Sequence, residues 1–191
     1  MDEKDLVQRS KDGDEEAFGV LVNKYKTKMY HLAYSLTHDA QVADDLAQEV
    51  FIKAYFALDK FKGKSEFGTW IYRIAINHCR DFLRKKNRII QIPLENIIEK
   101  ISTRESDILP EEKEQEETKR RKIIHTTIQT LPDKYRTILS LRDIQDFSYN
   151  EIARILVISP GTVDSRLHRA RKMLRTKLEP FFSQKGEGHE M

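Results

Sequence analysis

The segment from Ser148 to Arg171 constrains the fold of this chain most strongly, because it carries two helix starts separated by a short turn. Ser148 precedes Glu151 by three residues, which is the spacing of a capping box at a helix start. Ser159 followed by Pro160 suits the N-cap and the first position of a second helix. Together these signals predict a helix-turn-helix.

The apolar pattern of the same segment supports this prediction. Ala153 is small enough for two helices to cross closely, and Val163 follows ten residues later to fill the joint. An apolar stripe then leaves a polar, basic face outward at about 100° per residue. Short hydroxyls followed by arginines are typical of a helix that reads DNA. The predicted DNA contacts are Thr162, Ser165, Arg166, His168, Arg169 and Lys172. An ordinary helical hairpin with a basic surface is the alternative.

Helical periodicity also fills most of the remaining chain. We expect one helix after an N-cap at Asp14, a second after Asp39, and a third from about Glu66 to Lys86. Further helices are expected from near Lys119 and from Pro132 to about Ile144. The sequence therefore predicts an all-α fold of two small helical domains joined by an acidic linker. The expected parts are an N-terminal helical bundle at 1–92, the linker at 93–118, the helix-turn-helix domain at 119–180 and a tail at 181–191.

Charge is unevenly distributed along the chain, although the net charge of its 191 residues is only +3. The stretch from Glu95 to Glu117 has a net charge of −6, whereas Arg80–Arg88 holds five bases and Gly161–Leu178 holds six. Two basic clusters favour a nucleic-acid ligand, and solvated helix faces are the alternative explanation. The single cysteine, Cys79, excludes an intramolecular disulfide.

The third predicted helix carries a basic stripe. Its members are spaced by four, three and four residues, so they share one face: Arg73, Asn77, Arg80 and Arg84. The stripe spans about 16 Å and suits a phosphate backbone. Nearby aromatic residues could hold unpaired bases, and these are Phe61, Phe67, Trp70 and Tyr72. For Phe67 and Trp70 a place in the core is the favoured interpretation, while Phe61 stays open.

The second predicted helix has an acidic face separate from its apolar one. Asp45, Gln48, Glu49 and Ile52 lie on this face. A solvated surface and a docking surface for a protein partner explain it equally well.

Four motifs, taken in order, resemble the extracytoplasmic-function group of bacterial sigma factors in the sigma-70 family. They are DDLAQEVFIKAY, FKGKSEFGTWIYRIAINHCRDFLRKK, LPDKYR and EIARILVISPGTVDSRLHRARKML. The resemblance implies core RNA polymerase and promoter DNA as partners, with an anti-sigma factor as a further partner. It also implies that the acidic linker threads polymerase channels.

The same resemblance implies roles for particular residues. It places core-polymerase docking at Asp45, Gln48, Glu49 and Phe51. It assigns recognition and melting of the −10 element to Phe61, Lys62, Lys64, Trp70, Tyr72, Arg73, Asn77, Arg80 and Arg84. The helix-turn-helix would read the −35 element in the major groove through the contacts predicted above.

Two positions depart from the family pattern. Asp164 stands where a basic residue is common, which puts the expected phosphate contact there in doubt. Val157 stands in the turn where many members have Gly. A β-branched residue is strained at positive φ, so we predict that this turn adopts a different geometry.

Other classes of function remain to be weighed. A helix-turn-helix repressor or activator would normally bind DNA as a homodimer, and no dimerisation helix is evident. An enzyme is disfavoured because no phosphate loop, nucleophile motif or metal-ligand spacing appears, and His78–Cys79 lacks further ligands. We therefore expect no cofactor, no metal site and no catalytic residue. Neither a signal peptide nor an apolar run long enough to cross a membrane is evident, so we expect a cytoplasmic protein without membrane insertion.

Overall fold

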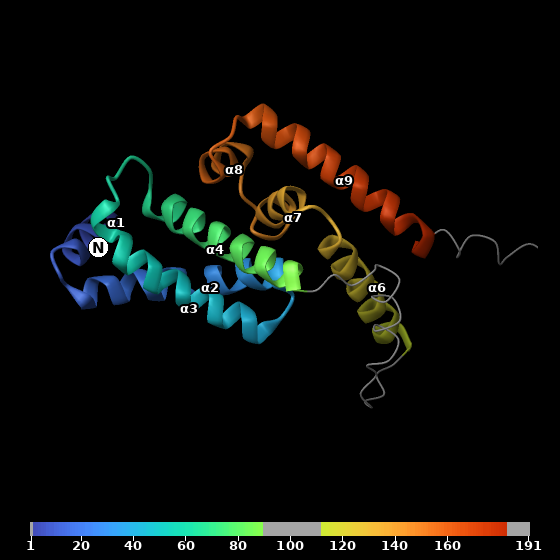
Figure 1. Cartoon of the computed structure of the whole chain (residues 1–191), viewed down its shortest axis with the longest axis horizontal. Coiled ribbons are helices and arrows are strands. Elements are labelled where there is room, and N and C mark those ends of the chain that lie inside the picture. The colour runs from blue at the N-terminus through green and yellow to red at the C-terminus, as the bar shows by residue number, and fades with distance from the viewer. Residues whose placement is uncertain (1, 90–111, 183–191) are drawn as a thin grey trace, which may run out of the picture.

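A computed structural model describes residues 2–89 and 112–182, which form helices with no strand among them (Figure 1). The N-terminal helices are α1 (Glu3–Lys11), α2 (Glu15–Thr37), α3 (Ala40–Ala57), the 3₁₀ turn η1 (Leu58–Lys60) and α4 (Phe67–Ile89). The C-terminal ones are α6 (Glu112–Gln129), α7 (Asp133–Leu139), the π-helical turn η2 (Ser140–Ile144), α8 (Tyr149–Leu156) and α9 (Pro160–Phe182). The all-α fold predicted from the sequence is confirmed.

Local caps start the N-terminal helices where the sequence predicts. The Asp14 carboxylate accepts a hydrogen bond from the Ala17 amide at 3.0 Å, and Asp39 accepts one from Val42 at 3.1 Å. Each cap satisfies an amide that would otherwise lack a partner in the first turn. Helix α1 was not expected, because its buried apolar residues are only Leu6 and Val7.

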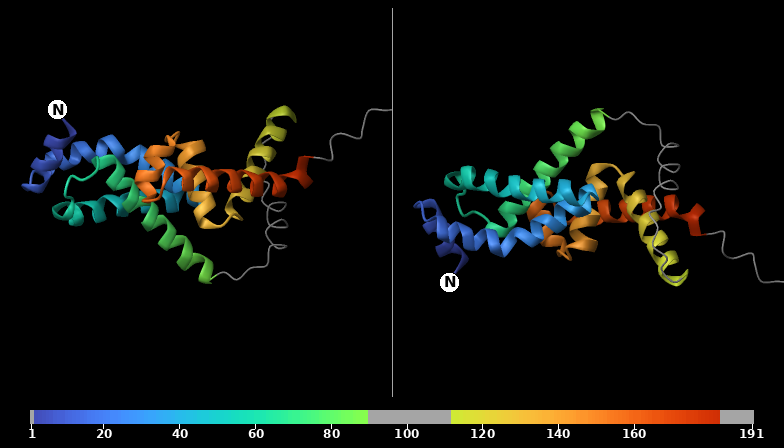
Figure 2. Two further views of the ribbon diagram at one scale, coloured as in Figure 1. Left: turned by 90° about the horizontal axis from the view of Figure 1, so that it is seen from above. Right: turned by 90° about the horizontal axis from the view of Figure 1, so that it is seen from below.

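The N-terminal core lies between α2, α3 and α4, which pack on one another, while α1 closes one end against α2 (Figure 2). The apolar stripes of these helices meet there. Burying one large aliphatic side chain contributes about 1.5–3 kcal/mol. The largest fully buried side chains are Leu21, Met29, Leu32, Leu36, Val50, Ile71 and Ile76.

The C-terminal core confirms the predicted helix-turn-helix. Ser148 and Glu151 form the reciprocal capping box at the start of α8. Ser159 accepts from the Thr162 amide at 3.1 Å at the start of α9. Val163 and Leu167 of α9 are fully buried, together with residues of α7, η2 and α8.

The turn between α8 and α9 corrects the expectation for Val157. This residue adopts the left-handed conformation, with φ 55° and ψ 51°, so the predicted change of turn geometry is wrong. The amides of Val157 and Ile158 both donate to the Ala153 carbonyl, as in a Schellman-type helix end. These bonds and the packing of α9 hold the backbone, although the conformation costs a β-branched residue about 1–3 kcal/mol.

The two helical parts contact one another. Helix α4 packs against α8 (Figure 1). Helix α2 packs against η2. Helix α6 begins at Glu112, inside the segment expected to be linker, and α9 continues to Phe182. The proposed domain boundaries stay predictions, and linker residues 93–111 and tail residues 183–191 lie outside the described residues.

Candidate nucleic-acid interface

Helix α9 presents the polar face expected of a DNA-reading helix. Ser165, His168 and Arg169 are exposed on it. Thr162 and Arg166 lie on the flank and are half-buried, and Lys172 is exposed one turn further on. This confirms the predicted orientation of the helix, whereas contacts of these side chains with DNA stay a prediction.

The hydroxyls at the start of α9 are held by one another. Ser159 and Thr162 share a hydrogen bond of 2.8 Å between their hydroxyl oxygens, and Ser165 donates to the Thr162 carbonyl at 3.2 Å. The first turn is therefore ordered before any ligand arrives. Asp164 is exposed beside these hydroxyls, where its charge would repel a nearby phosphate.

The basic stripe of α4 is only partly accessible. Asn77 and Arg84 are exposed, and Arg80 is half-buried. Arg84 pairs with Asp81 on its own helix. A cavity of about 510 Å³ is lined by the stripe together with Asp133 of α7, so the C-terminal part borders the stripe.

The N-terminal end of the stripe is occupied by the C-terminal part of the chain. Tyr72 is 4% exposed, and its hydroxyl donates to Gln145 Oε1 at 3.2 Å. Burial raises the pKa of Tyr72 to about 12. The Arg73 guanidinium donates to the Arg154 carbonyl through Nε at 3.1 Å and through Nη2 at 2.5 Å.

The loop before α4 rests on an aromatic cluster. The Phe61 ring lies 5.0 Å from Trp70 and 6.1 Å from Phe67, measured between ring centroids. Phe61 and Phe67 are buried and Trp70 is half-buried, which agrees with the core interpretation favoured for Phe67 and Trp70. Lys62 and Lys64 stand exposed on the loop, so they are its accessible cations.

Helix α1 packs beside this loop, which the sequence did not indicate. It lines a cavity of about 630 Å³ together with the loop. Lys11 of α1 donates to the Phe61 carbonyl at 2.5 Å and thereby ties the start of the loop to the helix. Two apolar residues in nine are too weak a signal for sequence reasoning to have placed α1 here.

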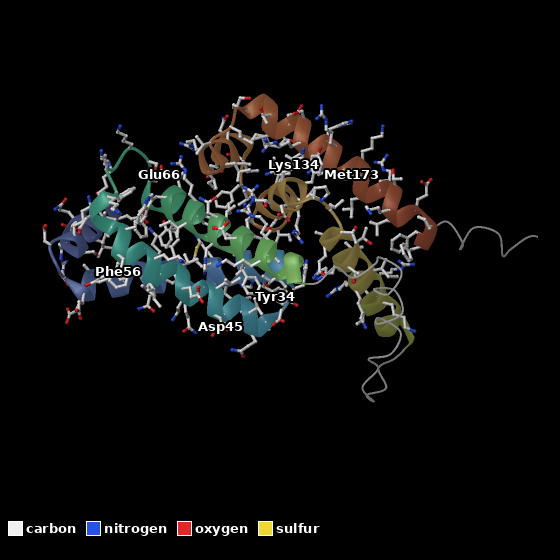
Figure 3. All side chains as sticks on the ribbon, in the orientation of Figure 1. Tyr34, Asp45, Phe56, Glu66, Lys134 and Met173 are labelled. Atoms are coloured by element: carbon white, nitrogen blue, oxygen red, sulfur yellow. The ribbon has the colours of Figure 1, made fainter. Side chains whose placement is uncertain are left out.

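The outer face of α3 mixes acidic and apolar side chains. Asp45, Gln48 and Glu49 are exposed as predicted, whereas Phe51 is only 8% exposed and belongs to the core. Glu49 Oε2 lies 2.6 Å from His78 Nε2 on α4. Figure 3 shows Asp45 and Phe56 at separate points along α3.

Sequence reasoning missed part of the apolar surface on α3. Phe56 is 79% exposed, and Ile52 and Tyr55 on the same helix are also exposed. The i, i+4 spacing of Ile52 and Phe56 beside the acidic face was the available signal. An apolar patch rimmed by polar residues is typical of a protein interaction site.

The described residues do not present the parts of a metal centre. Within 2–89 and 112–182, no three His, Cys, Asp or Glu side chains gather in a way that could hold an ion. Cys79 is buried, and burial raises the pKa of its thiol to about 12. Among the same residues no helix has the length and apolar character needed to cross a membrane.

Fold and surface together define a class of two-part helical proteins with a helix-turn-helix in the C-terminal part and a second basic helix, α4, in the N-terminal part. Comparison of the sequence with models of known protein families identifies the family within this class. Residues 21–89 match sigma-70 region 2, and residues 121–174 match sigma-70 region 4.

Curated relatives match nearly the whole chain. The RNA polymerase sigma-H factor of Pseudomonas aeruginosa is 39% identical, covering 93% of this chain and 94% of its own. The ECF RNA polymerase sigma-E factor of Escherichia coli K12 is 38% identical, covering 92% and 93%. Among solved structures, CnrH in complex with the cytosolic domain of CnrY gives a TM-score of 0.66 at 26% identity, over 92% of this chain and 96% of that one. The chain therefore belongs to the extracytoplasmic-function group of the sigma-70 family of RNA polymerase sigma factors.

Proposed function

We propose that this chain directs core RNA polymerase to promoters with −35 and −10 elements, and that the described surfaces divide the work. The observation that supports this most is the polar face of α9, with Ser165, His168 and Arg169 exposed opposite a fully buried apolar stripe. Sigma factors are initiation factors rather than catalytic enzymes, so we assign the chain no chemistry of its own. Its place of action is the cytoplasm, with the polymerase.

Helix α9 would read the −35 element in the major groove. Its first turn is ordered by Ser159 and Thr162, and the first turns of a recognition helix are those that reach base edges. Arg169 and Arg166 supply guanidinium groups that can bind guanine in a bidentate manner. Such a contact contributes about 1–3 kcal/mol of discrimination against a wrong base.

Helix α4 and its preceding loop would hold the −10 strand. Extracting a base from the stack costs a few kcal/mol. Phosphate contacts from Arg80 and Arg84, and from Lys62 and Lys64 on the loop, would offset part of that cost. The Phe61–Trp70 cluster gives the loop a rigid aromatic support. Each nucleobase that stacks on an aromatic side chain contributes about 1–3 kcal/mol to binding.

The outer face of α3 would dock on core polymerase. Its exposed carboxylates at Asp45 and Glu49 can steer association with a basic partner, and Ile52 and Phe56 supply apolar area for burial. CnrH, whose structure is similar, was solved with the cytosolic domain of CnrY. We therefore include an anti-sigma factor among the proposed partners.

Run-off transcription with purified core polymerase and pooled promoter fragments tests this function. Transcripts that appear only when the protein is added would support it, and their 5′ ends would locate both elements. Tight binding to duplex DNA by the protein alone, without added transcripts, would instead indicate a conventional repressor or activator.

A further inference from the structure

We propose that Lys11, at the end of α1, is a positioning residue that holds the loop before α4 in the shape needed to bind the −10 strand. The inference rests on the proposed function, in which Lys62 and Lys64 of this loop contact that strand. Lys11 acts through the loop backbone and does not itself contact DNA. Helix α1 thereby joins the elements on which −10 recognition depends.

The start of the loop is tied to α1 by a single cation. Lys11 Nζ donates to the Phe61 carbonyl at 2.5 Å and lies 5.8 Å from the centroid of the Phe61 ring. Hydrogen bonds from a charged donor are roughly twice as strong as those between neutral groups. Because the Phe61 ring is itself buried, both its side chain and its carbonyl are held in place.

The end of the loop is tied to the same helix through Tyr25. Glu3, at the start of α1, accepts a hydrogen bond from the Tyr25 hydroxyl at 2.8 Å. The Tyr25 ring lies 5.6 Å, between centroids, from the ring of Phe67, the first residue of α4. A Cβ on Gly68 would stand 2.8 Å from the Tyr25 hydroxyl oxygen, so glycine allows α4 to begin this close to the ring. Both ends of the loop therefore depend on α1.

Helix α1 is itself held firmly to the bundle. Leu6 and Val7 are buried in its core. Just beyond the helix, the Asp14 carboxylate accepts a hydrogen bond from Arg9 at 2.6 Å. A group that positions another must be fixed by its own packing and hydrogen bonds. Helix α1 meets this requirement, so Lys11 projects from a rigid support.

The middle of the loop is open to a ligand. Lys62, Gly63 and Lys64 are exposed, and Gly63 adopts φ 66°, a conformation that glycine enters without strain. A loop that is held at both ends loses less conformational entropy on binding than a free one. Loss of the bond from Lys11 to Phe61 would release one end, and binding of the −10 strand would weaken.

Substitution of Lys11 in the full chain, assembled with core polymerase, tests this role. Lys11→Met removes the hydrogen bond to Phe61 but keeps an unbranched side chain. The probe is a single-stranded −10 oligonucleotide from a promoter mapped by run-off transcription. We expect its affinity for the variant holoenzyme to fall about tenfold, the effect of losing one charge-assisted hydrogen bond. Lys11→Arg keeps a charged donor and should restore most of the affinity.

Salt dependence separates positioning from direct contact with DNA. A lysine that neutralises one phosphate of a single strand contributes about 0.7 to the slope of log affinity against log salt concentration. Lys11→Met should leave this slope unchanged, whereas Lys62→Met should reduce its magnitude by about 0.7. A reduced slope in Lys11→Met would overturn the inference, because Lys11 would then bind a phosphate itself.

Lys4→Met is the matched control, because it removes the same charge from the wall of the same cavity but not the bond to Phe61. A loss as large as that in Lys11→Met, or no loss in Lys11→Met, would overturn the inference. A parallel loss of affinity for core polymerase would also overturn it, since Lys11 would then support the whole bundle. Failure of the wild-type holoenzyme to bind the oligonucleotide would instead count against the proposed function.

Discussion

Val157 combines a strained backbone conformation with a side chain that is exposed to solvent. It is 74% exposed and adopts φ 55°, so its side chain gains little from burial while its backbone sits in a region that β-branched residues avoid. Glycine has no Cβ and enters this region readily.

We expect Val157→Gly to stabilise the chain by about 1 kcal/mol, because relief of the left-handed strain exceeds the entropy that glycine loses on folding. Denaturant unfolding of both proteins measures the difference. Val157→Ala should give a smaller gain, since alanine keeps a Cβ. A net loss of stability in Val157→Gly would contradict the strain assigned to this turn.

Arg169 is a second residue for which the effect of a single substitution can be predicted. Arg169→Ala should lower transcription from −35-dependent promoters about tenfold or more, because one guanidinium contact to a base contributes about 1–3 kcal/mol. Binding to core polymerase should not change. Arg175→Ala is the matched control, as Arg175 is exposed further along α9, and an equal effect of both would refute the assignment to Arg169.

At the scale of elements, α3 separates its two faces cleanly. Leu46, Val50 and Ala54 are buried against the bundle, while Asp45, Glu49 and Ile52 face outward. The exposed carboxylates and apolar side chains lie on one surface, remote in sequence from the helix-turn-helix. Polymerase docking and −35 recognition should therefore be separable by mutation.

Glu49→Lys should weaken core binding about tenfold or more while leaving binding of α9 to −35 duplex DNA unchanged, because it reverses a charge on the docking face. Affinity measurements with labelled core polymerase and with a −35 duplex distinguish the two effects. Glu16→Lys on α2 makes the same charge change at another exposed site. If it impaired core binding equally, net charge rather than the α3 face would be responsible.

In the molecule as a whole, the two helical parts contact one another through α2, α4, η2 and α8, and this arrangement is called the closed form below. His38 at the end of α2, whose ring contacts His125 of α6, links the closed form to pH. Its ring nitrogens are buried and have no hydrogen-bond partner among the described residues. Burial, together with the smaller electrostatic effects of His125 on α6 and Arg136 on α7, lowers the pKa of His38 to about 4. The closed form therefore requires this ring to be neutral.

The sign of the pH effect follows from that lowered pKa. Above the ordinary value of 6.5 the ring is neutral in both forms, so the closed form keeps its full stability. As the pH falls from 6.5 toward 4, an exposed His38 gains a proton that the closed form excludes. We expect the closed form to lose about 2 kcal/mol over this range, since the ring is partly exposed and solvent screens part of the penalty.

Small-angle scattering at decreasing pH measures this opening as a rise in the radius of gyration. His38→Asn is the control, because asparagine tolerates the left-handed backbone at φ 53° but does not titrate in this range. The variant should show a clearly smaller response than the wild type. Identical pH profiles would show that groups other than His38 drive any opening.

Most of the secondary structure was predictable because its signals are local. Asp14, Asp39 and Ser148 cap helices within three residues of themselves. The exposed face of α9 followed from its apolar stripe, and the acidic face of α3 from a similar period. Helix α1 was not predicted because its apolar signal is short. The burial of Phe61 and Tyr72 was not predicted because it depends on distant partners.

The helices, their caps and the faces they present follow from local sequence, since each depends on residues three or four positions apart. The left-handed backbone of Val157 does not, because the packing of α9 and the hydrogen bonds to the Ala153 carbonyl impose it. Tertiary structure also decided which part of the α4 stripe is free. Tyr72 contacts Phe147, and Ser35 contacts Ser140 across 105 positions of sequence. No local pattern encodes such pairs, because they exist only when two separately formed helical units meet.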